Sequence, residues 1–206
     1  MAVTDSDSKR SKMTEDAKTS RPKDAVSLHA PDRPLVLIGM MGAGKSSLGG
    51  RLANALALPF FDADAEIEKA AGMPIADIFA NHGEAAFRDG ERRVIKRLVA
   101  RGPQVLALGG GAFMDAQTRE LLAESAITIW LDVPIDELER RVKRKPGKRP
   151  LLAGVDIRQK LQSLMQERGP VYASADIRVS LPERAHEAAV TQIIEAVRQF
   201  DQTREA

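Results

Sequence analysis

Gly39-Met40-Met41-Gly42-Ala43-Gly44-Lys45-Ser46 is the stretch that decides the fold, because its spacing, G-x-x-x-x-G-K-[ST], is that of a phosphate-binding loop. The apolar run Leu35–Ile38 comes directly before it and indicates a buried strand. A helical pattern of apolar residues follows it, formed by Leu48, Leu52, Ala55 and Leu56. The alternative is a glycine turn that binds nothing, which would suit a pair of glycines. The complete spacing between a strand and a helix favours a nucleotide site.

The residue types in this loop explain the chemistry that it predicts. Glycines have no Cβ, so their backbone N–H groups can converge on phosphate oxygens. The helix that begins near Lys45 adds the positive end of its dipole. We expect Lys45 to reach the β- and γ-phosphates and Ser46 to offer its hydroxyl to Mg²⁺.

The composition of the chain limits the classes of protein that it can belong to. Its 206 residues, 43% of them hydrophobic, suffice for one α/β domain. The absence of cysteine excludes disulfides and thiolate metal sites and fits a reducing cytoplasm. The net charge of only +2 gives no reason to expect a nucleic-acid partner. No apolar run approaches membrane-spanning length, so we expect no membrane association.

Residues 1–32 differ from the rest of the chain. They are rich in Ser, Asp, Lys and Thr and nearly lack large apolar side chains, so they cannot offset the entropy of ordering. They have no apolar core of a secretory signal, and their acidic residues argue against a transit peptide. We expect a disordered N-terminal extension over 1–32 and a single domain over 33–206.

Two carboxylates follow the next expected strand, in Pro59-Phe60-Phe61-Asp62-Ala63-Asp64. Ligands in open α/β sheets lie at the carboxyl ends of strands, so both acids are placed for magnesium or for a hydroxyl nucleophile. The alternative is that one of them only caps the helix predicted over 65–71. A cap explains one acid and not both.

Two further segments carry candidate binding groups. A short helix over 75–80 and a longer one from Gly83 are predicted, and Arg88 lies at the edge of the longer helix's buried face, three residues before Glu91. This pair is either a held guanidinium or an exposed ion pair of little value, and the spacing leaves both open. Gly109-Gly110-Gly111 follows the buried strand predicted over 104–108, and suggests either close approach of a ligand or a flexible turn.

The C-terminal third adds a basic segment and an inward-facing arginine. Residues 143–150 contain five Lys or Arg with two prolines and a glycine, which favours a mobile lid closing on polyphosphate over a nucleic-acid patch. It follows the strand predicted over 126–131, where the lone Trp130 is expected in the core. In the next helix Arg168 continues the apolar stripe, and we expect Gly169-Pro170 to end that helix. Without other information, Arg168 is slightly better explained by reaching back to water, or by capping carbonyls in the last turn, than by a buried partner.

Taken together, these segments resemble shikimate kinase. The matching motifs keep that family's order and approximate spacing over about residues 33–200. They are Gly39–Ser46, Phe61-Asp62-Ala63-Asp64, Phe87-Arg88, Gly109-Gly110-Gly111, Arg149-Pro150-Leu151-Leu152, and Arg168 followed by Tyr172. The phosphate loop alone is generic, whereas the combination with Asp-x-Asp, the triple glycine and Arg-Pro-Leu-Leu is specific.

The resemblance implies a nucleoside-monophosphate-kinase-like α/β fold, a three-layer sandwich with a five-stranded parallel sheet. It implies a substrate-binding segment near 63–100 and a lid near 143–153. The implied reaction is transfer of the γ-phosphate of ATP to the 3-hydroxyl of shikimate, on the route to chorismate and the aromatic amino acids. A monomeric, cytoplasmic, Mg²⁺-dependent enzyme is expected.

Residue roles carry over by position. Shikimate is held by Asp64, Arg88, Gly110 and Arg168. The ATP phosphates are held by Gly42, Ala43, Gly44, Lys45, Ser46 and Ser47, together with the lid arginine Arg149. Ser46 is a magnesium ligand, and Asp62 acts on the metal indirectly, by contacting its ligands. Asp64, Lys45 and Arg149 are the implied catalytic residues, and Arg141 and Arg184 lie where the family contacts adenine.

The resemblance gives the two ambiguous arginines a common purpose. Shikimate is a small, polar carboxylate, and guanidinium groups match a carboxylate in charge and shape. Another small-metabolite kinase, such as a gluconate kinase, shares the loop and lid but has no need of this arginine pair. A nucleotide-dependent regulatory protein without catalysis is the second alternative, against which Asp64, Lys45 and Arg149 argue.

Overall fold

The apolar run before the phosphate loop forms the central strand of an all-parallel sheet. The computed structural model describes residues 31–144, 155–181 and 186–205. Strand β1 (Leu35–Ile38) lies between β3 (Val105–Ala107) and β4 (Ile127–Asp132), with Leu35 opposite Val105 and Ile127. The outer strands are β2 (Phe60–Asp62) and β5 (Ile177–Ser180), giving the order β2-β3-β1-β4-β5. Since β1 is covered on both faces, all four of its residues are buried.

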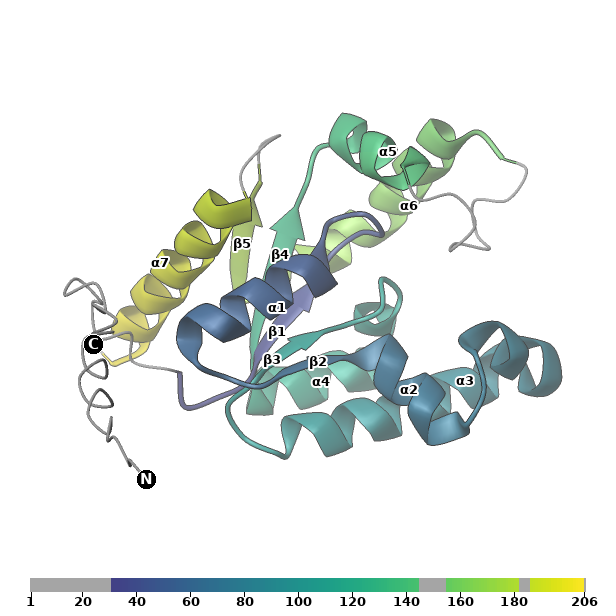
Figure 1. The fold of residues 1–206 in the computed structure, drawn as a ribbon, viewed down its shortest axis with the longest axis horizontal. Coiled ribbons are helices and arrows are strands. Elements are labelled where there is room, and N and C mark those ends of the chain that lie inside the picture. Colours follow the sequence, from purple (N-terminus) through teal and green to yellow (C-terminus); the bar gives the residue numbers. More distant parts are fainter. Residues whose placement is uncertain (1–30, 145–154, 182–185, 206) are drawn as a thin grey trace, which may run out of the picture.

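Helices cover both faces of this sheet and complete the predicted three-layer sandwich (Figure 1). One face carries α1 (Lys45–Leu56) and α7 (His186–Glu205). The other carries α3 (Ile75–Val99), α4 (Ala116–Ser125) and α6 (Ile157–Tyr172). At the carboxyl ends of the strands, α2 (Ala63–Ala71) and the start of α3 lie to one side and α5 (Ile135–Lys143) to the other.

Helix α1 packs directly onto the sheet because Gly49 has no side chain. A Cβ at Gly49 would lie 2.5 Å from the Phe60 ring and 3.3 Å from Leu37. The buried face of α1 is formed by Leu48, Gly49, Leu52, Ala53 and Leu56. The prediction that Ala55 belongs to this face is wrong, because Ala53 lies one turn after Gly49 and takes that place.

Helix α2 begins two residues earlier than predicted, which changes the position of Asp64. Asp64 lies in the first turn of the helix rather than at the end of a strand. The cap is Asp62, whose carboxylate accepts from the Asp64 N–H at 3.1 Å.

Two predicted helix boundaries had different outcomes. The expected break before the longer helix is confirmed, because Gly83 interrupts α3 with φ 76° and ψ 173°. The expected end of α6 at Gly169-Pro170 is wrong, because the helix continues to Tyr172. A proline in the last turn removes only one backbone hydrogen bond, and the Ala173 N–H still donates to the Gly169 carbonyl at 2.9 Å.

Some predictions concern residues outside the described ranges. These are nearly all of the expected N-terminal extension, most of the expected lid with Arg149, and Arg184. Within the described ranges, no helix combines the length and the apolar character needed to cross a membrane.

Candidate active site

The loop between β1 and α1 has the backbone that its glycines predict. Gly39, Gly42 and Gly44 have φ of 135°, 83° and 94°, a region that side chains strongly disfavour. The Ala43 N–H donates to the Met40 carbonyl at 3.1 Å and closes the turn. Within the described ranges, the N–H groups of Gly42 and Gly44 donate to no protein acceptor. The loop therefore presents backbone donors at the start of α1, as a phosphate site requires.

Lys45 and Ser46 lie at the base of this loop. The Lys45 Nζ donates to the carbonyls of Gly39 and Met40, at 2.9 and 3.1 Å, so its ammonium group lies along the loop. The Ser46 hydroxyl donates to the Asp62 Oδ2 at 2.5 Å. Asp62 both caps α2 and contacts the hydroxyl predicted to bind magnesium, so capping does not exclude a second role for this residue.

The three consecutive glycines lie where three of the predicted substrate residues meet. A Cβ at Gly109 would lie 2.6 Å from the Asp64 Oδ1, and one at Gly111 would lie 2.9 Å from the Arg88 Nη2. A Cβ at Gly110 would lie 3.5 Å from the Arg168 Nη1 and 3.7 Å from the Met41 N of the phosphate loop. Asp64, Arg88 and Arg168, from α2, α3 and α6, therefore converge on one glycine segment beside the phosphate loop. Any side chain on that segment would obstruct their approach.

Arg88 belongs to a partly buried ion pair rather than an exposed one. Its Nη1 lies 2.6 Å from the Glu91 Oε2, and the Glu91 side chain is only 3% exposed. A second, longer contact of 3.4 Å joins Arg88 to Glu84. Burial raises the pKa of Glu91, while the hydrogen bond and charge of Arg88 oppose this change. Glu91 thus holds the Arg88 guanidinium through Nη1, while the Arg88 Nη2 lies beside Gly111.

Arg168 faces inward, as its place on the apolar stripe predicts. Its Nη1 donates to the Gly110 carbonyl at 3.0 Å. Its Nε is buried, and no described residue accepts a hydrogen bond from it. A partly satisfied guanidinium at the edge of a site is suited to an anionic ligand.

Asp64 has an environment that disfavours its charge. Burial by the surrounding protein raises the pKa of its carboxyl group, and the Asp62 carboxylate adds to this effect. The positive charges of Lys45 and Arg88 act in the opposite direction without cancelling it. By its solvent-accessible surface Asp64 is nevertheless an exposed residue, so a substrate hydroxyl can reach it.

Arg141 lies over the phosphate loop. Its Nη1 donates to the Ala43 carbonyl at 3.0 Å, and its Nε donates to the Glu137 Oε1 at 2.5 Å. Glu137 also forms an ion pair with Arg140. Burial alone raises the pKa of Glu137, but hydrogen bonds from these two arginines outweigh it and hold that pKa below its usual value.

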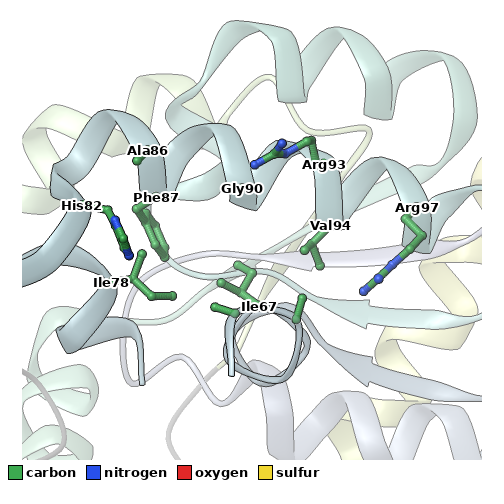
Figure 2. Close-up of a pocket in the computed structure, with 11 residues that line it drawn as sticks. Ile67, Ile78, His82, Ala86, Phe87, Gly90, Arg93, Val94 and Arg97 are labelled. Carbon is green, nitrogen blue, oxygen red and sulfur yellow. The ribbon is translucent and has the colours of Figure 1, made fainter. Parts of the chain in front are cut away.

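A groove between α2 and α3 contains none of the predicted site residues (Figure 2). Its volume is about 490 Å³, and its walls include Ile67, Phe87 and Val94. Arg93 and Arg97 lie at its rim, where they already pair with Asp89 at 3.2 Å and Glu66 at 3.8 Å. Among the lining residues His82 is the one polar side chain besides these two arginines, so the groove lacks the several converging charged groups of the glycine segment.

Sequence reasoning assigned no role to two residues that hold this site together. Tyr172 donates from its buried hydroxyl to the Gly110 carbonyl at 2.5 Å. The resemblance named Tyr172 without a role, and the expected helix end at Gly169-Pro170 gave no reason to place it on the Arg168 face of α6. Glu137 carried the signal of i,i+3 and i,i+4 spacing to Arg140 and Arg141, and its burial could be known only from the fold.

The sheet order, the phosphate loop after β1 and the charged groups around it define a phosphate-loop kinase of the nucleoside-monophosphate-kinase-like type. The protein-family model described as shikimate kinase matches residues 41–198. The chain belongs to the shikimate kinase family.

Individual relatives agree with this assignment. A shikimate kinase of Caulobacter vibrioides is 52% identical over 167 residues, covering 81% of this chain and 83% of the relative. One from Zymomonas mobilis is 52% identical over 165 residues, covering 80% and 93%. The structure of the Acinetobacter baumannii shikimate kinase in complex with shikimate superimposes with a TM-score of 0.77 at 34% identity, covering 82% of this chain and 95% of that one. A gluconokinase from Sinorhizobium meliloti, at 17% identity and a TM-score of 0.54, shares the fold alone.

Proposed function

We propose that this protein transfers the γ-phosphoryl group of ATP to the 3-hydroxyl of shikimate, giving shikimate 3-phosphate and ADP. The observation that carries the proposal is the convergence of Asp64, Arg88 and Arg168 on the three glycines beside the phosphate loop. An anion held there has its hydroxyls next to a bound triphosphate. Membership of the shikimate kinase family supports the same substrate and the use of ATP.

The phosphate loop binds and aligns the triphosphate. The backbone N–H groups from Gly42 to Ser47 donate hydrogen bonds to the phosphate oxygens at the positive end of α1. Lys45, which contacts loop carbonyls in this structure, turns its ammonium toward the β- and γ-phosphates. Phosphoryl transfer through a loose transition state depends mainly on such alignment and charge stabilisation. Arg141 lies against the loop and is placed to contact the nucleotide.

The two arginines select a carboxylate. Arg88, held by Glu91, and Arg168, whose Nε donates to no described residue, bind the ring carboxylate from two sides, while the Gly110 backbone lies between them. Gluconate is also a carboxylate, but it is a flexible chain and presents its hydroxyls differently.

Asp64 orients the nucleophilic hydroxyl and accepts its proton. Its raised pKa makes the carboxylate a better proton acceptor than an ordinary aspartate. The proton moves from the substrate oxygen to an Asp64 carboxylate oxygen as that substrate oxygen bonds to phosphorus.

The residues at the start of α1 fit a magnesium ion. A hydroxyl at the helix start and an adjacent carboxylate, Ser46 and Asp62, supply oxygen donors of the kind that Mg²⁺ prefers. Ser46 would bind the ion, and Asp62 would orient the Ser46 hydroxyl and water molecules around it. When bound, the ion neutralises charge on the β- and γ-phosphates.

Four further points belong to the proposal. The domain spans 33–206, with residues 63–100 holding shikimate and 143–153 acting as the lid. Arg149 in that lid contributes positive charge to the transferred group. The enzyme acts as a monomer in the cytoplasm. Arg184 contacts adenine, together with Arg141.

A coupled assay of ADP release with shikimate and with gluconate tests the reaction. Turnover on shikimate, with gluconate at background, is the expected result. Turnover on gluconate alone would assign the chain to the other small-metabolite kinases. Tight ATP binding with no phosphorylated product from either acid would favour a regulatory protein that has lost catalysis.

A further inference from the structure

Tyr172 is fully buried; its hydroxyl donates to the Gly110 carbonyl at 2.5 Å and also lies within hydrogen-bonding reach of the Arg168 guanidinium. It lies four residues after Arg168 in α6, so the two side chains leave the same face of the helix. The Arg168 Nη1 donates to the same carbonyl at 3.0 Å. A carbonyl oxygen has two lone pairs, so the two donors together satisfy it.

These two bonds fix the direction of a whole peptide unit. The peptide between Gly110 and Gly111 is trans and planar, so its N–H points away from its C=O. Since the carbonyl is bound toward α6, the Gly111 N–H points away from α6. Within the described ranges, the N–H groups of Gly110 and Gly111 donate to no protein acceptor. Both donors thus lack a described protein partner, and the glycines that carry them lie beside Arg168 and Arg88.

A glycine segment needs such a restraint more than other sequences do. Three consecutive glycines have the largest backbone freedom of any tripeptide, and no side chain of their own packs against the core. Gly110 lies between the Arg168 guanidinium and the phosphate loop, with the Met41 N 3.7 Å from the position of its Cβ. Rotation of this peptide would point a carbonyl oxygen at the substrate carboxylate.

Tyr172 is suited to act as a permanent donor. Burial raises the pKa of its hydroxyl, so the group stays protonated at neutral pH. Its ring packs near Trp130, with centroids 6.0 Å apart, so the phenol is held by the core next to β4.

We propose that Tyr172 is a positioning residue of the substrate site: its hydroxyl fixes the Gly110 peptide, and thereby the backbone donors that lie between Arg88 and Arg168. Its effect reaches the carboxylate of the acceptor through Gly110 and Arg168, without contact to the reacting atoms. This inference rests on the proposed binding of shikimate at the glycine segment.

Tyr172→Phe removes only the hydroxyl and keeps the ring in the core. The expected result is a shikimate KM raised about 5- to 20-fold, from loss of a buried hydrogen bond. The KM for ATP should change less than about 2-fold, and kcat less than the shikimate KM, because the phosphate loop is untouched.

Thr128→Val is the matched control. Thr128, on β4, is buried as Tyr172 is. Its hydroxyl donates to the Asp176 Oδ2 at 2.7 Å, away from the glycine segment. This variant loses a buried hydroxyl and stability, but its shikimate KM should remain within about 2-fold of wild type. Equal KM changes in the two variants, or an unchanged shikimate KM in Tyr172→Phe, would overturn the inference.

A second measurement separates this inference from the proposed function. In protein labelled with ¹⁵N-glycine and without ligand, Tyr172→Phe should speed hydrogen exchange or shift the amide resonances of Gly110 and Gly111, and Thr128→Val should not. Unchanged hydrogen exchange and unchanged amide resonances of Gly110 and Gly111 in Tyr172→Phe would contradict the positioning role. If the wild-type protein neither binds nor phosphorylates shikimate, the proposed function fails, and the amide measurement still decides whether Tyr172 orders this segment.

Discussion

At the scale of one residue, Asp64 shows how a group used in the proposed reaction can lower the stability of the fold. Burial and the nearby Asp62 raise the pKa of its carboxyl group, so folding disfavours the charge that the proposed reaction uses. A carboxyl group with a raised pKa in the folded state stabilises the fold only at low pH. This stabilisation is complete below the unfolded-state pKa, near 3.9, and is lost as the pH rises through the folded-state value.

Asp64→Asn should therefore increase stability at neutral pH while it lowers kcat by about 100-fold or more, because the proton acceptor is lost. The gain in melting temperature should be present above the folded-state pKa and disappear below about pH 3.9, where both side chains are neutral. Scanning calorimetry from pH 3 to 8 measures the first effect and initial rates measure the second. A melting temperature below that of wild type at pH 7 would contradict this account of the charge.

Arg168 tests the recognition of the acceptor. Arg168→Ala should raise the shikimate KM about 30-fold or more, since truncating one partner of a buried charge pair costs about 2–5 kcal/mol. Arg168→Lys keeps the charge but lacks the planar fork and the second donor to a carboxylate, so an intermediate KM is expected. Steady-state kinetics with each substrate varied in turn make the measurement. A shikimate KM that is the same in all three proteins would refute the pairing.

At the scale of elements, sequence patterns predicted the existence of helices and strands better than their ends. The apolar runs of β1 and β4 could be recognised because strands buried on both faces have continuous apolar sequence. The end of α6 could not, because proline usually ends a helix and only its position in the last turn made it tolerable. Tyr172 was named in the resemblance, but with the helix expected to end at Gly169-Pro170 nothing predicted its contact to Gly110.

The break in α3 depends on glycine for a reason that the backbone makes plain. Gly83 has φ 76° and ψ 173°, a region that residues with a side chain avoid, and a Cβ there would contact nothing within 4 Å. Gly83→Ala should therefore destabilise through backbone strain alone, by about 1–3 kcal/mol. In a protein of 206 residues this lowers the melting temperature by roughly 2–10 °C.

Gly50→Ala is the control for that variant. Gly50 lies inside α1, and an added Cβ there also contacts nothing within 4 Å, so alanine should stabilise by about 0.5–1 kcal/mol. Thermal unfolding of the two variants should thus shift in opposite directions from wild type. Equal shifts in the same direction would show that the backbone of Gly83 is not the source of the effect.

For the whole molecule, the strand order brings together what the sequence separates. The loop after β1 and the glycines after β3 are about 70 residues apart, yet β1 and β3 are neighbours in the sheet. The sequence indicated each segment, and the carboxyl ends of parallel strands indicated a common edge. The contact between Gly110 and the phosphate loop required the order β2-β3-β1-β4-β5, which no local pattern specifies.

This arrangement predicts two adjacent sites that can be occupied and disabled separately. Shikimate, or a non-hydrolysable ATP analogue with Mg²⁺, should each stabilise the fold by about 2.7 kcal/mol at 100 times its dissociation constant. That corresponds to a rise in melting temperature of roughly 5–10 °C for 206 residues. Together the two ligands should give at least the sum of the two shifts.

Two variants should remove these shifts one at a time. Lys45→Ala should lose most of the shift produced by the nucleotide, and nearly all turnover, while it keeps the shift produced by shikimate. Arg168→Ala should keep the nucleotide shift and lose that of shikimate, because its guanidinium lies at Gly110 and not on the loop. Thermal unfolding of wild type and both variants, with each ligand alone and with both, makes the test. If either variant loses both shifts equally, the two ligands share one site, and the separation of phosphate loop and glycine segment is wrong.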